Sequence, residues 1–328
     1  MKRHSILSLL FSACLVGANA ANAQTSADNW PSRPITLIVP SSAGGTSDIT
    51  ARIVAEHVSK TLGQPIVIEN RPGASNTSGP SAALRARADG YTFATGSPSS
   101  MILAPLSMED LSYKQSDFQP VSGLTINEMV MNVNAALPIT NPKELVAWAK
   151  QQNKATNFGS YGIGSYPHIV ANILGIQNKF AAVHIPYKAE QEMILGTARG
   201  DIAYSISVMP TGKKMQDTGR TRVIGVLSPK RSPLQPEIPT FMEMGFTDPA
   251  FQLLGWGALY APKGVPQPII KKMEQAMLEA LNSDDVRQKM QAVYSIPWAA
   301  PAKEVDGIMK KETVIYRDLL KAADIETQ

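Results

Sequence analysis

The stretch ITLIVPSSAGGTSDITARIVAEHVSKTLGQPIVIEN, residues 35–70, decides the fold. Its first five residues are apolar or β-branched and precede a proline, which is typical of a buried strand. The loop 41–48 is rich in glycine and serine, and apolar residues then recur at helical spacing over 49–62. Gly63 is placed to end this helix, and residues 65–70 read as a second strand. The order strand, glycine loop, helix, strand predicts a parallel βαβ unit.

A second unit of the same design lies in the middle of the chain. Residues 157–159 end a short strand, 160–165 form another loop of small residues, and 166–174 read as a helix. Further strands are expected over 183–187 and 202–206. No fixed period relates the two units, so this is a recurrence of architecture and not a sequence repeat. The sequence therefore predicts an α/β protein of two lobes, each with a mixed, mainly parallel sheet flanked by helices.

The last part of the chain, 266–328, is expected to be mostly helical. Its apolar residues recur at helical spacing: Ile269, Ile270, Met273, Met277, Leu278 and Leu281. Methionine at such positions usually fills a core, so we expect the Met side chains to be buried and not to form a partner surface.

The N-terminus has the pattern of a secretory signal peptide over residues 1–23. A basic start is followed by a short apolar run and by Ala21-Asn22-Ala23, an A-x-A cleavage site. We expect export to the periplasm and a mature chain that begins at Gln24. Cys14, the one cysteine of the sequence, would then be removed, so a disulfide is not expected. The alternative is a lipoprotein site at Phe11-Ser12-Ala13-Cys14, with Cys14 lipidated.

The composition gives little support to nucleic-acid binding. Removal of residues 1–23 takes away Lys2 and Arg3 and no acid, so 31 basic residues become 29 against 27 acidic ones. No basic stripe with interleaved aromatic residues is present. The 328 residues are enough for two domains, and no stretch after the leader is apolar enough to span a membrane.

Both glycine loops stand between the end of a strand and the start of a helix, where open α/β sheets bind their ligands. The first N–H groups of a helix have no partner within it and carry the positive end of the dipole, so they suit an anion. Thr46, Ser47, Ser160 and Ser165 add hydroxyl donors. The alternative is that the glycines only make tight turns and Ser47 caps a helix. Asp48 reads as a helix N-terminal charge and not as a catalytic acid.

Catalysis has little basis in the sequence. After the leader the histidines are His57, His168 and His184, and no nucleophile elbow, Walker loop or H-E-x-x-H motif occurs. Ser165 and His168 are close in sequence, but no third group is evident to orient the histidine. Metal-ligand spacing is also absent, so we expect no catalytic residue, no metal and no cofactor.

Several motifs in this order resemble one family, the Bug-type solute receptors of tripartite tricarboxylate transporters. These motifs are Pro31-Ser32-Arg33-Pro34-Ile35, the loop to Asp48, Glu69-Asn70-Arg71-Pro72-Gly73-Ala74, Asp89-Gly90-Tyr91, Phe158-Gly159-Ser160, His184-Ile185-Pro186-Tyr187-Lys188 and Arg231-Ser232-Pro233. They span nearly the whole chain after the leader.

The resemblance implies a periplasmic binding protein fold with a first lobe of 24–122 and 228–328 and a second lobe of 123–227. The lobes would be joined by strands that cross near Ser122 and Leu227, and a carboxylate would bind between them. The implied ligand-binding residues are Ser41, Ser42, Ala43, Gly44, Gly45, Thr46, Asp48, Ser97, Ser160, Tyr161, Gly162, Ile163, Gly164, Ser165, His168, Tyr204 and Ser207.

Departures from the family pattern bear on the ligand. Ser42-Ala43 stands where a Pro-Pro pair is common, Met101 where His is frequent, and Ser207 where many relatives carry Asp. Without that acid, the site lacks an obvious partner for a ligand amino group, and a second ligand carboxylate would not be repelled. Tyr161 and Tyr166 stand where small residues are common, and Tyr204 is expected nearby. Such rings could stack on a flat ligand, or they could pack outside the pocket.

These observations predict a solute-binding protein and not an enzyme. The preferred ligand is a dicarboxylate, with an aromatic one such as terephthalate as a candidate, and the partners are the integral membrane subunits of a transporter. We expect a monomer whose lobes close on the ligand. Two alternatives stay open: a receptor that presents its ligand to a membrane sensor, and an enzyme on the same fold. The sequence decides neither the exact ligand nor the partner.

Overall fold

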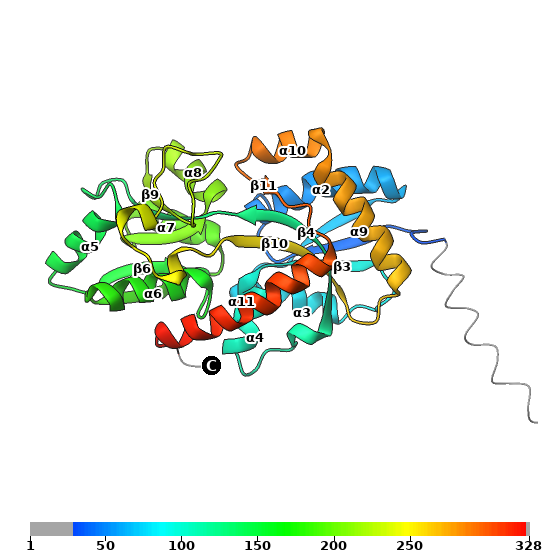
Figure 1. The fold of residues 1–328 in the computed structure, drawn as a ribbon, viewed down its shortest axis with the longest axis horizontal. Helices are drawn as coiled ribbons and strands as arrows, with labels where there is room; N and C mark the ends of the chain where they lie inside the picture. Colours follow the sequence, from blue (N-terminus) through cyan, green and yellow to red (C-terminus); the bar gives the residue numbers. More distant parts are fainter. Residues whose placement is uncertain (1–28, 326–328) are drawn as a thin grey trace, which may run out of the picture.

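The computed structural model describes residues 29–325. The expected signal peptide (1–23), its cleavage site and Cys14 lie outside the described residues. Two β-sheets, each flanked by helices, lie side by side and are joined by strands that pass from one to the other (Figure 1). We call the elements around the six-stranded sheet the first lobe and those around the five-stranded sheet the second lobe. The predicted two-lobed α/β fold is confirmed.

The first lobe contains the sheet β11-β4-β10-β3-β1-β2. Its strands are β1 (Ile35–Val39), β2 (Ile66–Asn70), β3 (Thr92–Gly96), β4 (Phe118–Asn127), β10 (Gly255–Pro262) and β11 (Ile296–Pro297). Its helices are α2 (Thr46–Leu62), α3 (Ser78–Leu84), α4 (Ala104–Ser107), α9 (Gln267–Asn282), α10 (Asp284–Gln291) and α11 (Ala302–Ala322). Short helical turns are η1 (Ala74–Asn76), η2 (Ser99–Leu103) and η3 (Gln115–Asp117).

The second lobe contains the sheet β7-β6-β8-β5-β9. Its strands are β5 (Met129–Asn134), β6 (Thr156–Ser160), β7 (Ala182–Pro186), β8 (Tyr204–Val208) and β9 (Thr221–Leu227). Its helices are α5 (Pro142–Gln151), α6 (Tyr166–Asn178), α7 (Glu190–Arg199) and α8 (Met209–Asp217). The short turns η4 (Met242–Met244) and η5 (Pro249–Phe251) belong to the segment that leads back to the first lobe.

The two sheets share one arrangement. In the first, β1 lies between β2 and β3 and is parallel to both, and β10 then pairs antiparallel with β3. In the second, β6 lies between β7 and β8 in the same way, and β5 pairs antiparallel with β8. The parallel pairs come from the βαβ units, and the antiparallel pairs come from strands that connect the lobes. The carboxyl ends of the parallel strands therefore define one edge of each sheet.

The quoted stretch folds as its pattern predicts. β1 is almost wholly buried, and α2 follows it after the glycine loop. Gly63 ends α2 in the left-handed conformation, with φ of 69°, which costs glycine little because it has no Cβ. The buried face of α2 packs against α9 and the sheet, in a cluster that includes Val54, Val58, Met273 and Met277. The methionines of α9 are core residues, as expected.

Elements of the second unit differ from the prediction mainly at their ends. α6 continues to Asn178 and ends with Lys179 in the left-handed conformation, beyond the expected end at residue 174. β8 starts at Tyr204, two residues after the expected start of that strand. α11 packs on β4 and η2 of the first lobe and also contacts α6 of the second. None of the helices within residues 29–325 is long and apolar enough to cross a membrane.

The connections between the lobes run through Glu128 and through the segment between β9 and β10. Ser122 pairs with Leu259 inside the first sheet, and β4 stays in that sheet as far as Asn127. The chain enters the second sheet at Met129, after the buried Glu128. β9 ends at Leu227, and β10 starts the return at Gly255. The division of the chain at 122/123 and 227/228 stays a prediction.

Candidate functional site

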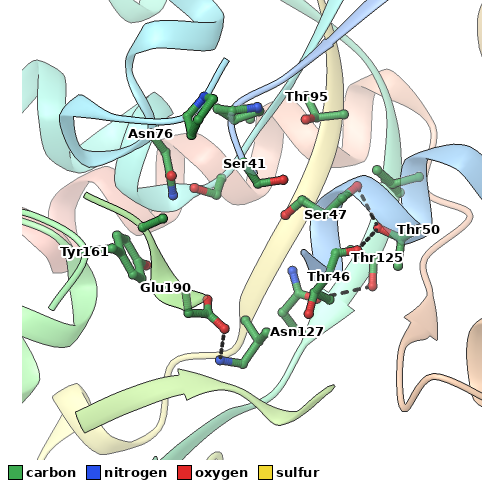
Figure 2. Close-up of a pocket in the computed structure, with 18 of the residues that line it drawn as sticks. Ser41, Thr46, Ser47, Thr50, Asn76, Thr95, Thr125, Asn127, Tyr161 and Glu190 are labelled. Carbon is green, nitrogen blue, oxygen red and sulfur yellow. Dashed lines mark hydrogen bonds between the residues drawn. The ribbon is translucent and has the colours of Figure 1, made fainter. Parts of the chain in front are cut away.

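A cleft of about 740 Å³, a volume that includes the solvent at its mouth, lies between the lobes where the strands of both sheets end. Its first-lobe lining includes Pro40, Ser41, Thr46, Ser47, Thr50, Pro72, Asn76, Thr95, Gly96 and Ser97. Leu124, Thr125, Asn127, Trp256 and Gly257 come from the connecting strands β4 and β10. The second lobe contributes Tyr161, Lys188, Ala189, Glu190, Gln191 and Val208 (Figure 2).

Three hydroxyl groups on the first-lobe side are buried and unpaired. The Oγ atoms of Ser41 and Ser97 and the Oγ1 atom of Thr95 have no hydrogen-bond partner within residues 29–325. Ser41 follows β1, and the other two stand at the end of β3, so two adjacent parallel strands bring them to one edge. A buried hydroxyl without a partner costs roughly 1–3 kcal/mol. A ligand with acceptor oxygens would remove that cost.

The N-terminus of α2 adds backbone donors beside these hydroxyls. Thr46 and Ser47 are its first residues and line the cleft, and Gly45 before them makes no side-chain cap. Thr50 is occupied, because its hydroxyl donates to the carbonyls of Thr46 and Ser47. A 17-residue helix presents the positive end of its dipole here. The combination of free N–H groups and free hydroxyls suits an anion.

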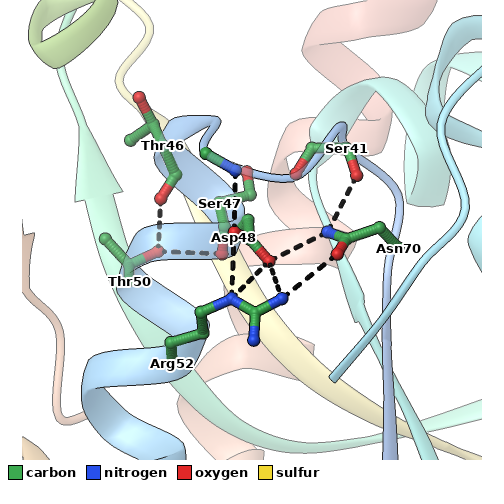
Figure 3. Close-up of polar contacts among 8 residues, drawn as sticks. Ser41, Thr46, Ser47, Asp48, Thr50, Arg52 and Asn70 are labelled. Atoms are coloured by element: carbon green, nitrogen blue, oxygen red, sulfur yellow. Dashed lines mark hydrogen bonds and ion pairs between the residues drawn. The ribbon is translucent and has the colours of Figure 1, made fainter.

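Asp48 holds the first glycine loop in place and does not line the cleft. Its buried carboxylate accepts the N–H of Gly44 at 2.9 Å, Nε of Arg52 at 3.0 Å and Nδ2 of Asn70 at 2.9 Å (Figure 3). Asn70 also donates to the carbonyl of Ser41. Burial acts to raise the pKa of Asp48, but the bonds from Arg52, Gly44 and Asn70 outweigh it and hold the pKa below its usual range. Asp48 is thus a charged clamp on the loop.

The second glycine loop bonds mainly to itself. The N–H of Gly162 donates to Oγ of Ser160 at 3.1 Å, and the N–H of Gly164 donates to Nδ1 of His168 at 3.1 Å. The hydroxyl of Ser165 donates to the carbonyl of Gly162. Ser160 also bonds to Nε2 of His184 at 2.7 Å. These donors are occupied, and Tyr161 is the residue of this loop that lines the cleft.

The three candidate tyrosines have different environments. Tyr161 lines the cleft, and its hydroxyl bonds to Oγ of Ser99 at 3.1 Å. Tyr166 is buried behind the loop, and its hydroxyl donates to the carbonyl of Ala250. Tyr204 is fully buried and stacks on Phe158. Tyr161 therefore supplies the aromatic surface of the second lobe, whereas the other two pack outside the pocket.

Ser207 lies outside the cleft lining and is fully buried. Its Oγ accepts Nδ2 of Asn132 at 2.9 Å and donates to the carbonyl of Val208. The carboxyl group near this strand end comes instead from Glu190, which accepts the N–H of Val208 at 3.4 Å. The argument that this end of the cleft has no acid is thus corrected, because α7 places one there.

Contacts between the lobes surround the cleft. Thr46 of the first lobe bonds to Thr211 of the second, Oγ1 to Oγ1, at 3.1 Å. The hydroxyl of Ser75 donates to the carbonyl of Ile163 at 3.2 Å. Ser75 belongs to three successive non-glycine residues with positive φ, 46°, 54° and 70° for Ala74, Ser75 and Asn76. This strained turn places the side chain of Asn76 at the cleft.

Histidine chemistry lies behind the cleft and not in it. The rings of His168 and His184 stack with centroids 3.8 Å apart, and neither residue is part of the cleft lining. Burial lowers the pKa of His184 to about 4, and burial together with the neighbouring His184 lowers that of His168 to about 3. Ser160, which pairs with His184, is fully buried. Within residues 29–325 no group of three His, Cys, Asp or Glu side chains could hold a metal.

Of the residues proposed from sequence, Ser41, Thr46, Ser97 and Tyr161 line this cleft. The other proposed residues are not part of its lining: Ser42, Ala43, Gly44, Gly45, Asp48, Ser160, Gly162, Ile163, Gly164, Ser165, His168, Tyr204 and Ser207. Sequence reasoning did not single out Asn76, Thr95, Asn127 or the segment 188–191. That segment follows a strand and starts α7, so the strand–loop–helix signal could have located it.

The fold and the cleft define a two-lobed solute-binding architecture, and comparisons with known proteins agree. The model of the tripartite tricarboxylate transporter family receptor matches residues 50–324. BugT of Bordetella pertussis is 32% identical over 292 residues, which cover 88% of this chain and 89% of BugT. The chain belongs to this receptor family, and it is a Bug-type member.

Solved structures support the assignment. An R. palustris protein solved with adipate is 28% identical, with a TM-score of 0.86 over 91% of this chain and 99% of that one. MatC from Rhodopseudomonas palustris, solved with malate, is 26% identical, with a TM-score of 0.81 over 89% of this chain and 100% of MatC. The molecules bound in these two structures, adipate and malate, are small carboxylates.

Proposed function

We propose that the protein binds a small carboxylate in the cleft between its lobes and delivers it to the membrane subunits of a tripartite tricarboxylate transporter. The observation that carries this proposal is the set of three buried, unpaired hydroxyls of Ser41, Thr95 and Ser97 beside the N-terminus of α2. These hydroxyls have no hydrogen-bond partner among the described residues, and all three residues line the cleft. Family membership supports the delivery step.

The carboxylate is expected to bind mainly to the first lobe. There the donors are free, whereas those of the loop 160–165 are largely occupied by bonds within the second lobe. Closure of the second lobe would bring Tyr161 and the segment 188–191 over the ligand and exclude water. Weaker screening in a dry cleft strengthens each charged hydrogen bond.

A more specific hypothesis for the ligand is a dicarboxylate, and terephthalate is the aromatic candidate. The adipate and malate complexes of two similar proteins support a dicarboxylate. The ring of Tyr161 at the cleft supports an aromatic ligand. The carboxyl group of Glu190 in the same cleft weighs against a second ligand carboxylate. A screen of mono- and dicarboxylates by thermal shift would rank these ligands, because a ligand that binds only the folded protein raises its apparent stability.

Thr95→Val tests the proposed carboxylate site. The substitution keeps the shape of the side chain and removes a hydroxyl that has no hydrogen-bond partner within residues 29–325. We expect unchanged or slightly higher stability in urea, together with about tenfold weaker binding of the best carboxylate by calorimetry, since a hydrogen bond to a charged group contributes roughly 1.5–3 kcal/mol. Thr221→Val is the matched control, because Thr221 is buried with an unpaired hydroxyl and does not line the cleft. Equal affinity of both variants would contradict the proposal.

Export to the periplasm is part of this proposal. It predicts that the protein purified from the periplasm starts at Gln24, as the A-x-A site indicates. N-terminal sequencing decides between this start and a lipid-modified Cys14.

A further inference from the structure

Glu190 is the one acidic side chain among the residues that line the cleft, and Lys188 is the one basic side chain. Figure 2 shows the carboxyl group of Glu190 on the second-lobe side, across from Ser41 and Asn76. Its hydrogen-bond partner is uncharged, the N–H of Val208 at 3.4 Å, and the uncharged hydroxyl of Thr211 acts to lower its pKa. No ion pair within residues 29–325 includes Glu190 or Lys188. The cleft therefore holds a carboxyl group without a cationic partner.

A favourable interaction with the dipole of α7 does not by itself explain why an acidic residue stands at position 190, inside the cleft. An acid in the first turn of a helix gains from the dipole, but Glu192 fills that role in the same turn on the exposed side. Glu190 is directed into the cleft, where burial raises its pKa to about 7 against the bonds from Thr211 and Val208. The dipole does not offset the cost of burial. A ligand group that pairs with this carboxylate would offset it.

The free hydroxyls of the cleft and its one carboxyl group stand on opposite lobes, and Lys188 lines the second-lobe side together with Glu190. Free hydroxyl and N–H donors stand on the first-lobe side, and a carboxylate acceptor stands on the second-lobe side. A ligand that satisfies both needs an anionic end and a hydrogen-bond-donating, cationic end. A dianionic ligand would bring its second charge toward Glu190 and add a like-charge repulsion.

We propose that Glu190 determines ligand specificity, and that the ligand is an amino carboxylate whose ammonium group pairs with Glu190 while its carboxylate binds the first lobe. This inference rests on the proposed function, because it adds only which residue binds the second end of the same ligand and which chemical group that end carries. Thr211 stands between the two halves of the site, since its hydroxyl acts to lower the pKa of Glu190 and bonds to Oγ1 of Thr46 at 3.1 Å, beside the donors of the first lobe. An ammonium group at Glu190 would thus bind where the lobes meet.

Two sets of matched probes test the ligand class on the unmodified protein. One set is butyrate, glutarate and 4-aminobutyrate, and the other is 4-methylbenzoate, terephthalate and 4-(aminomethyl)benzoate. Within a set, every probe has the same carboxylate at one end. The group at the other end is an apolar methyl, an anionic carboxylate or a cationic ammonium. We expect the ammonium member of at least one set to bind at least tenfold more tightly than its dicarboxylate, as measured by calorimetry near pH 8 and low salt.

The substitution Glu190→Gln tests the residue itself. It keeps the shape and removes the charge, so binding of the ammonium probe is expected to weaken about tenfold or more, while the monocarboxylate changes less than threefold and the dicarboxylate binds as well or better. Glu192→Gln is the matched control, because it removes the same charge from the same turn of α7 on its exposed side. It is expected to leave all six affinities unchanged.

The outcomes separate this inference from the proposed function. If dicarboxylates bind more tightly than ammonium probes in both sets, or if Glu190→Gln does not weaken the ammonium probe, the assignment of Glu190 is wrong, and carboxylate capture stands. If no probe carrying a carboxylate binds, the proposed function itself fails. The comparison on the unmodified protein decides the ligand class even if Glu190→Gln fails to fold.

Discussion

Gly162→Ala is predicted to prevent full closure of the lobes. A Cβ atom at this position would lie 2.0 Å from Oγ of Ser75 and 3.1 Å from its Cα, both on the opposite lobe. Rotation of the serine hydroxyl could relieve the first contact but not the second. The lobes would have to move apart, and the bond from Ser75 to the carbonyl of Ile163 would be lost.

The expected cost to ligand binding is on the order of 1–3 kcal/mol, which corresponds to a roughly ten- to hundredfold loss of affinity. This cost is the sum of two losses in the closed state: the hydrogen bond between the lobes and the packing around it. An alanine at φ of 143° is also strained, and this strain is a separate cost within the second lobe. Because the strain is present in the open and in the closed state, it lowers the stability of the protein but changes the ligand affinity little.

Calorimetry with the best carboxylate measures the affinity, and small-angle scattering with and without ligand measures closure. The unmodified protein should become more compact on binding, and Gly162→Ala should do so less. Gly219→Ala is the control, because Gly219 of the second lobe also has a positive φ, 73°, but nothing lies within 4 Å of its added Cβ. Adding Ser75→Gly to Gly162→Ala should restore part of the affinity. An affinity of Gly162→Ala within twofold of the unmodified protein would refute the reasoning.

Two further predictions concern the supports behind the cleft. Burial lowers the pKa values of His168 and His184 to about 3 and 4, so the unfolded chain binds more protons at these two histidines below pH 6.5, and the stability that the pair contributes is full above that pH and falls by roughly 2 kcal/mol per pH unit between about pH 6 and 4.5. Glu190 and Glu312, whose pKa values burial raises to about 7, act with the opposite sign, so the test compares urea unfolding of the unmodified protein with that of His168→Asn/His184→Asn; the same pH dependence in both would contradict the buried neutral pair. Asp48→Asn should destabilise the protein by about 1–3 kcal/mol in urea at pH 7, because it weakens the bonds from Arg52 and Gly44. Asp89→Asn, which breaks an exposed pair, should change stability by less than about 1 kcal/mol, and equal effects of the two changes would count against the clamp.

The first βαβ unit could be predicted from sequence because each of its signals is local. The period of the apolar residues changes at the glycine loop, and Gly63 ends α2 as its position predicts. The lobe connection was harder to predict. β4 and β5 are interrupted only at Glu128, so the residues of two different sheets form one nearly continuous run of strand. The sheet to which β4 belongs follows from long-range pairs such as Ser122 with Leu259, and a local sequence pattern does not contain them.

The candidate site could be predicted only where strand ends determine it. Ser41 and Thr46 belong to the first glycine loop, whose role follows from its place after β1. The loop 160–165 has the same local pattern, yet its donors are taken by partners such as His184, 24 residues away from Ser160. Glu190 reads in sequence as an ordinary helix N-terminal acid. Whether such a side chain enters a cleft or faces solvent depends on how α7 packs, which local pattern does not encode.

The structure of the protein with its tightest-binding carboxylate tests the central claim most directly. The account predicts a ligand carboxylate within hydrogen-bond distance of the hydroxyls of Ser41, Thr95 and Ser97 and of the first N–H groups of α2, with the second lobe closed over it. A carboxylate bound outside this cleft, or one bound in it with these three hydroxyls still unpaired, would contradict the account.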